Sequence, residues 1–158
     1  MSTEMKRRIF LKRSLAAGAV GVAAGAGLLA PQQLLAAWNK AAFEAKEMPK
    51  ALDALLGSSS LSESADINVK APDIAENGAV VPITISTSLD GVESISVIAS
   101  NNPSPLVASF VLGKGAAGFA STRIKMGKTG DVIAVVKANG KLYSAKKEVK
   151  VTIGGCGG

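Results

Sequence analysis

The feature of this chain that most restricts its fold is a series of short runs in which apolar and polar residues alternate. The runs cover 67–69, 81–85, 95–99, 106–112, 119–126, 132–137 and 141–153. A period of two residues is typical of a strand that buries one face. Turn-forming residues separate most runs at intervals of about 11–14 residues, close to the spacing in an all-β sandwich. The pattern therefore predicts an all-β fold, a seven-stranded immunoglobulin-like β-sandwich over residues 63–153.

Two local features refine this prediction. Asn139-Gly140 is the strongest hairpin signal, because both central residues of a type I′ turn need a positive φ. The sandwich lacks the Cys…Trp…Cys core of antibody domains, since the one cysteine of the chain is Cys156, beyond the last predicted strand.

A short helix is predicted ahead of the sandwich, within a helical segment and linker over residues 38–62. It combines a proline suited to a first helical turn, leucines at helical spacing and a glycine suited to the C-terminal cap: Pro49, Leu52, Leu55, Leu56 and Gly57. The serine-rich stretch 58–62 that follows is interpreted as a linker. Trp38 and Phe43 precede the helix, and we expect them to pack on the domain or on a partner.

Residues 1–37 have the pattern of an export signal. Five basic residues lie within the first 13 positions, and no charged residue follows between Ser14 and Asn39. Arg7 and Arg8 open the hexapeptide Arg-Arg-Ile-Phe-Leu-Lys, which resembles the twin-arginine signal. The apolar run is long enough to be weighed as a membrane span, but it is rich in glycine and no basic flank follows it. We therefore expect export into the periplasm and no permanent membrane anchor.

This signal accounts for most of the positive charge. The chain carries 18 Lys and Arg against 12 Asp and Glu, whereas residues 38–158 carry 13 against 11, a net charge of +2. With no basic stripe and 4% aromatic residues, nothing indicates nucleic-acid binding. The twin-arginine route moves proteins that are already folded. Because no cofactor ligands are visible, the route favours export together with a partner subunit that lacks a signal of its own.

The segment 154–158 places Cys156 among four glycines, Gly154, Gly155, Gly157 and Gly158. Such a segment offers nothing to bury, and glycine loses more conformational entropy on ordering than any other residue. It can serve as a slim, flexible arm for a thiol. Because the chain contains no histidine, imidazole-based nucleophilic catalysis and imidazole-bound metals are excluded. We therefore predict no catalytic residues, no metal ligands and no cofactor, and interpret Cys156 as a covalent handle.

Two other uses of Cys156 stay open at this point. The chain can be a structural or interaction protein whose terminal cysteine forms an intersubunit disulfide. Cys156 can also be one soft ligand of a copper or redox site shared with a partner. The glycines favour the carrier, since a structural disulfide gains from a rigid anchor.

Three stretches of the sequence resemble the SoxY family, the sulfur-compound carriers of the periplasmic thiosulfate-oxidising Sox system. They are the twin-arginine hexapeptide, residues 74–78 with Val81-Pro82, and residues 149–158, where Gly-Gly-Cys-Gly-Gly is the most specific part. The resemblance implies an immunoglobulin-like sandwich that forms a heterodimer with a second sandwich subunit, SoxZ. It also implies that Cys156 holds the substrate while other proteins carry out the chemistry.

The resemblance implies three further partners. A c-type cytochrome joins thiosulfate oxidatively to the sulfur of Cys156, and a manganese-dependent hydrolase releases sulfate from the adduct. In many bacteria a molybdenum–haem sulfur dehydrogenase then oxidises the remaining sulfane sulfur. The chain itself is expected to be a carrier subunit and not an enzyme.

Overall fold

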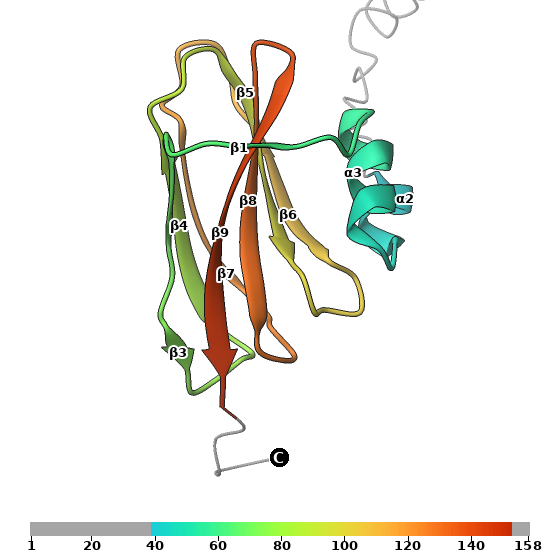
Figure 1. Cartoon of the computed structure of the whole chain (residues 1–158), viewed down its shortest axis with the longest axis vertical. Helices are drawn as coiled ribbons and strands as arrows, with labels where there is room; N and C mark the ends of the chain where they lie inside the picture. Colours follow the sequence, from blue (N-terminus) through green and yellow to red (C-terminus); the bar gives the residue numbers. More distant parts are fainter. Residues whose placement is uncertain (1–38, 153–158) are drawn as a thin grey trace, which may run out of the picture. The chain divides into compact units, whose positions relative to one another are not determined.

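The computed structural model describes residues 39–152, which form a β-sandwich with two short helices at its N-terminal side (Figure 1). The predicted export signal, Trp38 and the predicted arm 154–158 lie outside the described residues. Within the described part, no helix is long and apolar enough to cross a membrane. The helices and strands are α2 (Lys40–Glu44), α3 (Met48–Leu56), β1 (Ser62–Glu63), β2 (Ile67–Lys70), β3 (Ile74–Ala75), β4 (Val81–Thr87), β5 (Val92–Ala99), β6 (Leu106–Val111), β7 (Phe119–Ile124), β8 (Gly130–Ala138) and β9 (Lys141–Val151).

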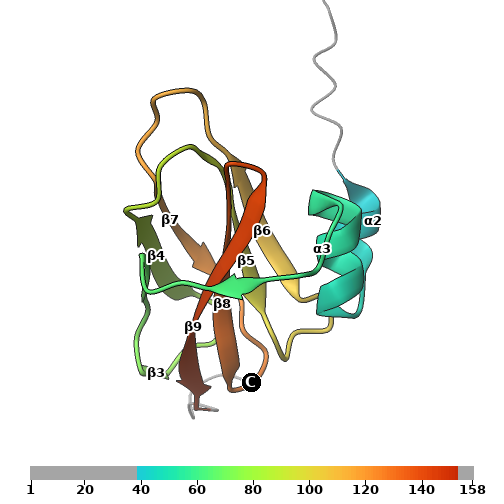
Figure 2. The same cartoon turned by 45° about the horizontal axis from the view of Figure 1, so that its top comes forward.

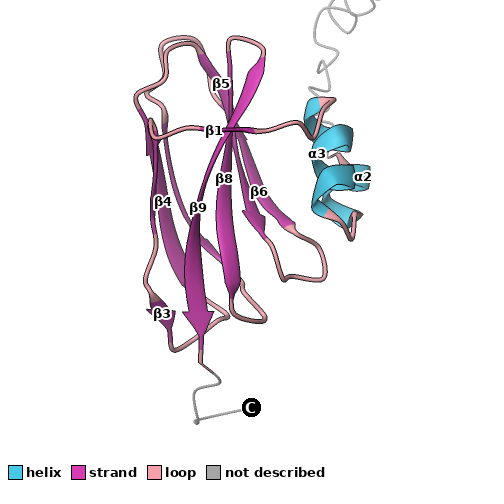
Figure 3. Ribbon diagram, viewed as in Figure 1, coloured by secondary structure: helices cyan, strands magenta, loops and turns pink. Residues whose placement is uncertain are grey.

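The strands form two sheets. The large sheet has the order β1-β9-β8-β5-β6, and β3 also pairs with β9, while the small sheet has the order β2-β4-β7. Neighbouring strands are antiparallel except β1 and β3, which both pair in parallel with β9. Figure 3 shows how the strands dominate the described part of the chain. The predicted immunoglobulin-like sandwich is thus confirmed, with two short strands, β1 and β3, that the alternation in the sequence did not indicate.

The core lies between the two sheets and is built from small and branched aliphatic side chains. Alternate residues of each strand point inward, as the period of two requires. The small sheet contributes Val81, Ile83 and Ile85, and the large sheet contributes Ile95, Val97 and Val136, all at most 2% exposed. Every fully buried side-chain nitrogen or oxygen of the described residues has a hydrogen-bond partner.

The helices cover part of the outer face of the large sheet (Figure 2). Leu52 of α3 is fully buried against Ile98 of β5 and Val135 of β8, which point away from the sandwich core. These strands are therefore apolar on both faces. Alternation alone cannot predict which of the two faces packs in the core and which packs against the helices. Phe43 packs against the same cluster. The expected ends of the helix are confirmed, with proline in the first turn and Gly57 as a left-handed cap at φ +79°.

The predicted hairpin at residues 139–140 joins β8 to β9. Asn139 has φ +50° and Gly140 has φ +72°, as a type I′ turn requires. Glu93 of β5 fastens this turn to the sheet: it accepts a hydrogen bond from the backbone N–H of Gly140 at 2.9 Å and pairs with Lys137 at 3.1 Å. The hydrogen bond from Gly140, followed by the one from Lys137, lowers the pKa of Glu93 below its ordinary value.

This pKa shift predicts a pH-dependent contribution to stability. Because the folded-state pKa lies below the unfolded one, Glu93 stabilises the fold above the unfolded pKa, and this contribution disappears as the pH falls through the folded pKa. Glu93→Gln should therefore lower the unfolding temperature at neutral pH and make no difference in acid. Thermal unfolding across pH measures this, with Glu148→Gln as the matched control. If the unfolding temperature of Glu93→Gln stayed below that of the unmodified chain by the same amount down to strongly acidic pH, the Glu93 carboxylate would not be the source of the pH dependence.

Candidate functional site at the end of strand β9

The chain reaches Cys156 directly from β9, so the end of this strand is the base of the predicted arm. β9 ends at Val151, and Cys156 lies four residues beyond Thr152, outside the described residues. Around the end of β9 the structure brings together β3 and three loops, 76–80, 100–105 and 125–129 (Figure 1). We refer to these contacts together as the arm base.

On one side, β3 fastens the last residues of β9. The two strands pair in parallel, with Ala75 opposite Val151. The backbone N–H of Lys150 donates to the carbonyl of Asp73 at 2.9 Å, and that of Thr152 donates to the carbonyl of Ala75 at 3.1 Å. The backbone is therefore held as far as Thr152.

On the other side, one side chain satisfies both backbone groups of Val151. The hydroxyl of Thr129 accepts a hydrogen bond from the N–H of Val151 at 2.9 Å and donates to its carbonyl at 3.4 Å. The β8–β9 ladder ends at Gly130 and Val149. Because Thr129 directly precedes β8, its hydroxyl replaces the backbone partner that Val151 would have if the ladder continued.

Two asparagines from the β5–β6 loop support the loop that carries Thr129. The side-chain amide of Asn101 donates to the carbonyl of Thr129 at 2.7 Å. Asn102 donates to the carbonyl of Lys125 at 2.7 Å and accepts from the N–H of Gly127 at 3.0 Å. The position of the loop therefore depends on side chains and not on a sheet ladder.

Gly78 is the point of closest packing at the arm base. Its carbonyl accepts a hydrogen bond from the N–H of Met126 at 2.7 Å. A Cβ atom on Gly78 would lie 2.3 Å from the carbonyl oxygen of Met126 and 2.8 Å from Cγ1 of Val151. Only glycine allows the three chain segments to meet at this distance.

The arm base predicts a specific effect for Thr129→Val, which removes the hydroxyl and keeps the shape. We expect faster amide hydrogen exchange at Val151 and Thr152, while the free energy of unfolding falls by about 1 kcal/mol or less, since one exposed hydroxyl is lost. Thr129→Ser should restore slow exchange. Thr84→Val is the matched control, because the hydroxyl of Thr84 pairs with Ser121 on the small sheet. Unchanged exchange in Thr129→Val would mean that the hydroxyl does not hold the strand end.

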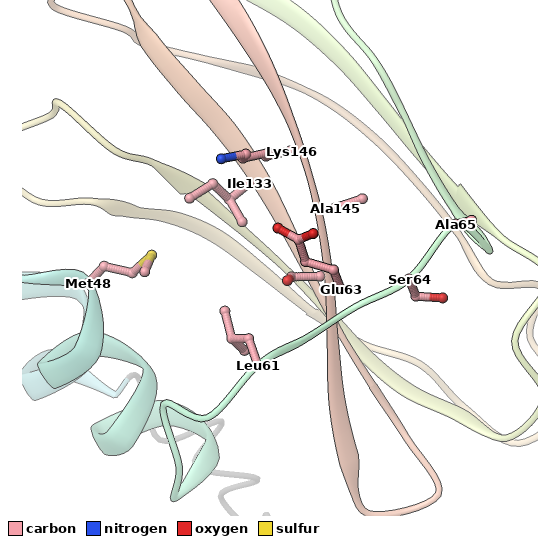
Figure 4. A pocket seen from close by; sticks show the side chains of 9 residues that line it. Met48, Leu61, Glu63, Ser64, Ala65, Ile133, Ala145 and Lys146 are labelled. Carbon is pink, nitrogen blue, oxygen red and sulfur yellow. The ribbon is translucent and has the colours of Figure 1, made fainter.

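A groove of about 510 Å³ lies on the outer face of the large sheet, beside α3 (Figure 4). Met48, Leu61 and Ile133 form its apolar part, and Glu63 and Lys146 are polar residues that line it. Lys146, the groove residue nearest the end of β9, lies six residues before Thr152, a distance of about 20 Å along a strand. The four residues from Thr152 to Cys156 span at most about 14 Å. The groove is therefore out of reach of Cys156, and we do not assign it to the thiol.

The described residues form no group of three or more His, Cys, Asp or Glu side chains able to hold a metal ion. The predicted site residues Cys156, Gly154, Gly155, Gly157 and Gly158, like Arg7 and Arg8, lie outside the described residues. Sequence reasoning attaches no functional weight to Thr129, Asn101 and Asn102, which lie between the predicted strands. Gly78 lies in the stretch 74–78 that carried the family resemblance, although no role was attached to it.

Together, the fold and the arm base define a class of protein: an immunoglobulin-like β-sandwich with a C-terminal segment that contains one cysteine. Hydrogen bonds hold the last strand of the sandwich as far as the start of that segment. The sequence model of the family described as sulfur oxidation protein SoxY matches residues 52–156, a span that includes Cys156. This chain belongs to the SoxY family.

Solved structures agree with this membership. The sulfur carrier protein SoxY from Chlorobium limicola f thiosulfatophilum is 48% identical, with a TM-score of 0.60 over 65% of this chain and 94% of that chain. A superoxide reductase (neelaredoxin) from Ignicoccus hospitalis is 17% identical, with a TM-score of 0.48 over 54% of this chain and 79% of that chain, and carries no functional argument. No curated protein sequence matches this chain.

Proposed function

We propose that this chain is a periplasmic carrier that holds thiosulfate-derived sulfur intermediates covalently on Cys156 and presents them to partner enzymes. Membership of the SoxY family supports a sulfur-carrier role. The observation that carries the proposal is that the family match extends to Cys156, just beyond a strand end that is hydrogen-bonded up to Thr152. A thiol on a segment beyond a fixed base can be moved between enzymes without moving the domain.

In the proposed cycle the chain supplies a nucleophilic sulfur and its partners supply the redox and hydrolytic chemistry. Loading forms a bond between the Cys156 sulfur and the outer sulfur of thiosulfate; the thiol loses its proton and two electrons pass to a c-type cytochrome. A manganese-dependent hydrolase then adds water across the bond to the sulfonate group. Sulfate leaves, and one sulfur stays on Cys156 as a persulfide. Where a molybdenum–haem sulfur dehydrogenase is present, it oxidises that sulfur, and a second hydrolysis frees the thiol.

Covalent geometry limits how these enzymes can use the arm. Four residues beyond Thr152 place the Cα of Cys156 at most about 14 Å from the arm base. An active site that receives the adduct must therefore lie within about that distance of the docked domain. The four glycines add no side chains, so the segment can enter a narrow channel.

The proposal extends to the export of the chain. Residues 1–37 serve as a twin-arginine signal, recognised through Arg7 and Arg8, and no membrane anchor remains after its removal. A SoxZ-like sandwich subunit forms a heterodimer with this chain and is exported with it. Fractionation and co-purification from the native host test both statements, and a partner with a signal of its own would contradict the second.

Intact mass tests the carrier role directly. The chain is incubated with thiosulfate, the cytochrome and an electron acceptor, and we expect a gain of one S₂O₃ group on Cys156. A dimer that reductant converts to unmodified monomer, with no sulfur adduct, would instead support the alternative of an intersubunit disulfide.

A further inference from the structure

The strands of the small sheet carry positive charge and no negative charge on their outer face. Strand alternation places one set of residues outward, because the intervening residues, such as Ile83, Ile85 and Ile124, are buried in the core. Together with Val80 before β4 and Lys125 after β7, they form what we call the cationic face: Asn68, Lys70, Val80, Pro82, Thr84, Ser86, Phe119, Ser121, Arg123 and Lys125. Asp66, directly before β2, is an exposed acidic residue at the end of the sheet away from Arg123, where Ser64 and Ser88 donate hydrogen bonds to its carboxylate. The strands β2, β4 and β7 contain no Asp or Glu.

The three cations of this face have no ionic partner within the described residues. The ion pairs found there involve Lys40, Lys50, Lys137 and Lys147, and none involves Lys70, Arg123 or Lys125. By contrast, the outer face of the large sheet mixes both signs. Its Asp131 and Glu148 lie opposite each other on β8 and β9, and Lys137 pairs with Glu93. The positive charge of the cationic face is therefore a local property and not the average of a domain that is close to neutral.

The cationic face also offers apolar contact area at both ends. Phe119 is 53% exposed at the start of β7, and Val80 is 51% exposed just before β4. Between them the side chains are short, and the hydroxyls of Thr84 and Ser121 pair with each other at 3.1 Å. An exposed aromatic residue on the same face as an arginine is the composition that protein interfaces favour.

The face is continuous with the arm base. Lys125 directly precedes Met126, whose N–H is bound by Gly78, and the Cα of Gly78 packs close to Val151. Arg123 of β7 lies opposite Pro82 of β4 in the strand register, at the same end of the sheet. A protein bound over Arg123 and Lys125 would thus lie next to the point where the chain leaves for Cys156.

We propose that the cationic face is the docking surface for the enzymes that act on Cys156, and that each of them offers an acidic patch to it. This inference rests on the proposed carrier function. The size of the cationic face favours transient binding. Its three short strands cover roughly 300 Å², which is less than the surface of about 800 Å² that each side of a stable complex buries. A second copy of the chain does not fit, because the same face on two copies would bring cations together.

The test measures binding separately from chemistry. Affinity of the chain for the purified thiosulfate-loading cytochrome is measured by titration without thiosulfate. Arg123→Glu combined with Lys125→Glu should weaken binding about tenfold or more and flatten its salt dependence, since charge steering is lost. Lys146→Glu, the same kind of charge reversal on the large sheet, should leave the affinity unchanged. Thermal unfolding checks that all variants are folded.

The outcomes distinguish the two proposals. Equal affinity of the double variant and the unmodified chain, or binding that is insensitive to salt, would overturn the docking surface. So would a homodimer in sedimentation that the double variant abolishes, because the occupant would then be a second copy. Absence of an S₂O₃ adduct on Cys156 in the separate mass measurement would overturn the carrier function, even if the cytochrome bound.

Discussion

Cys156→Ser should abolish the gain of thiosulfate-derived sulfur and all turnover that depends on it, while leaving the domain folded. A serine hydroxyl cannot form the sulfur–sulfur bond that holds the adduct, so no residual carrier activity is expected. The substitution lies four residues beyond the last hydrogen bond of the arm base, that from Thr152 to Ala75. Because serine and cysteine side chains have similar sizes and the substitution lies beyond the last strand, the free energy of unfolding should change by less than about 0.5 kcal/mol.

Two measurements on this variant separate the carrier from its alternatives. Intact mass after incubation with thiosulfate and the cytochrome should show the unmodified chain, and sulfate release by the hydrolase should fall to background. Binding to the cytochrome should stay at the affinity of the unmodified chain, since the cationic face is untouched. Sulfate release that persists in Cys156→Ser would contradict the carrier function.

The large-scale fold was predictable because the sandwich core needs only alternation. Val81, Ile83 and Ile85 alternate with outward polar or small residues, and the structure buries all three. The turn at Asn139-Gly140 was predictable for a different reason, since few residue pairs accept two positive φ angles. Local rules of this kind act within a few residues and can be read from the sequence directly.

Strands β1 and β3 escaped prediction because they have two residues each and no period to detect. They exist because β9, with eleven residues, extends far enough to pair with both of them. The arm base was hidden in the same way. Thr129 contacts Val151 across 22 positions of the sequence, and Asn102 contacts Lys125 across 23. The hydrogen-bonding capacity of these residues was visible, but their partners were set by the packing of the two sheets.

Gly78→Ala tests whether close packing at the arm base controls where Cys156 is presented. The added Cβ would lie 2.3 Å from the carbonyl oxygen of Met126, which is backbone and cannot rotate away. The loop must therefore shift, and overpacking of this kind costs about 1–3 kcal/mol. We expect a lower free energy of unfolding, measured by denaturant titration, together with faster exchange of the Val151 and Thr152 amides.

The matched control is Gly113→Ala, in the β6–β7 loop, where an added Cβ meets nothing within 4 Å. It should leave both stability and exchange unchanged. If Gly78→Ala were as stable as the unmodified chain, the loop would be more adaptable than its contacts indicate, and the base of the arm would not be rigid. If instead stability falls and loading of Cys156 slows at unchanged affinity for the cytochrome, the defect lies in the presentation of the thiol and not in docking. That combination would show that the domain does more than tether a cysteine: it fixes the point from which the cysteine is delivered.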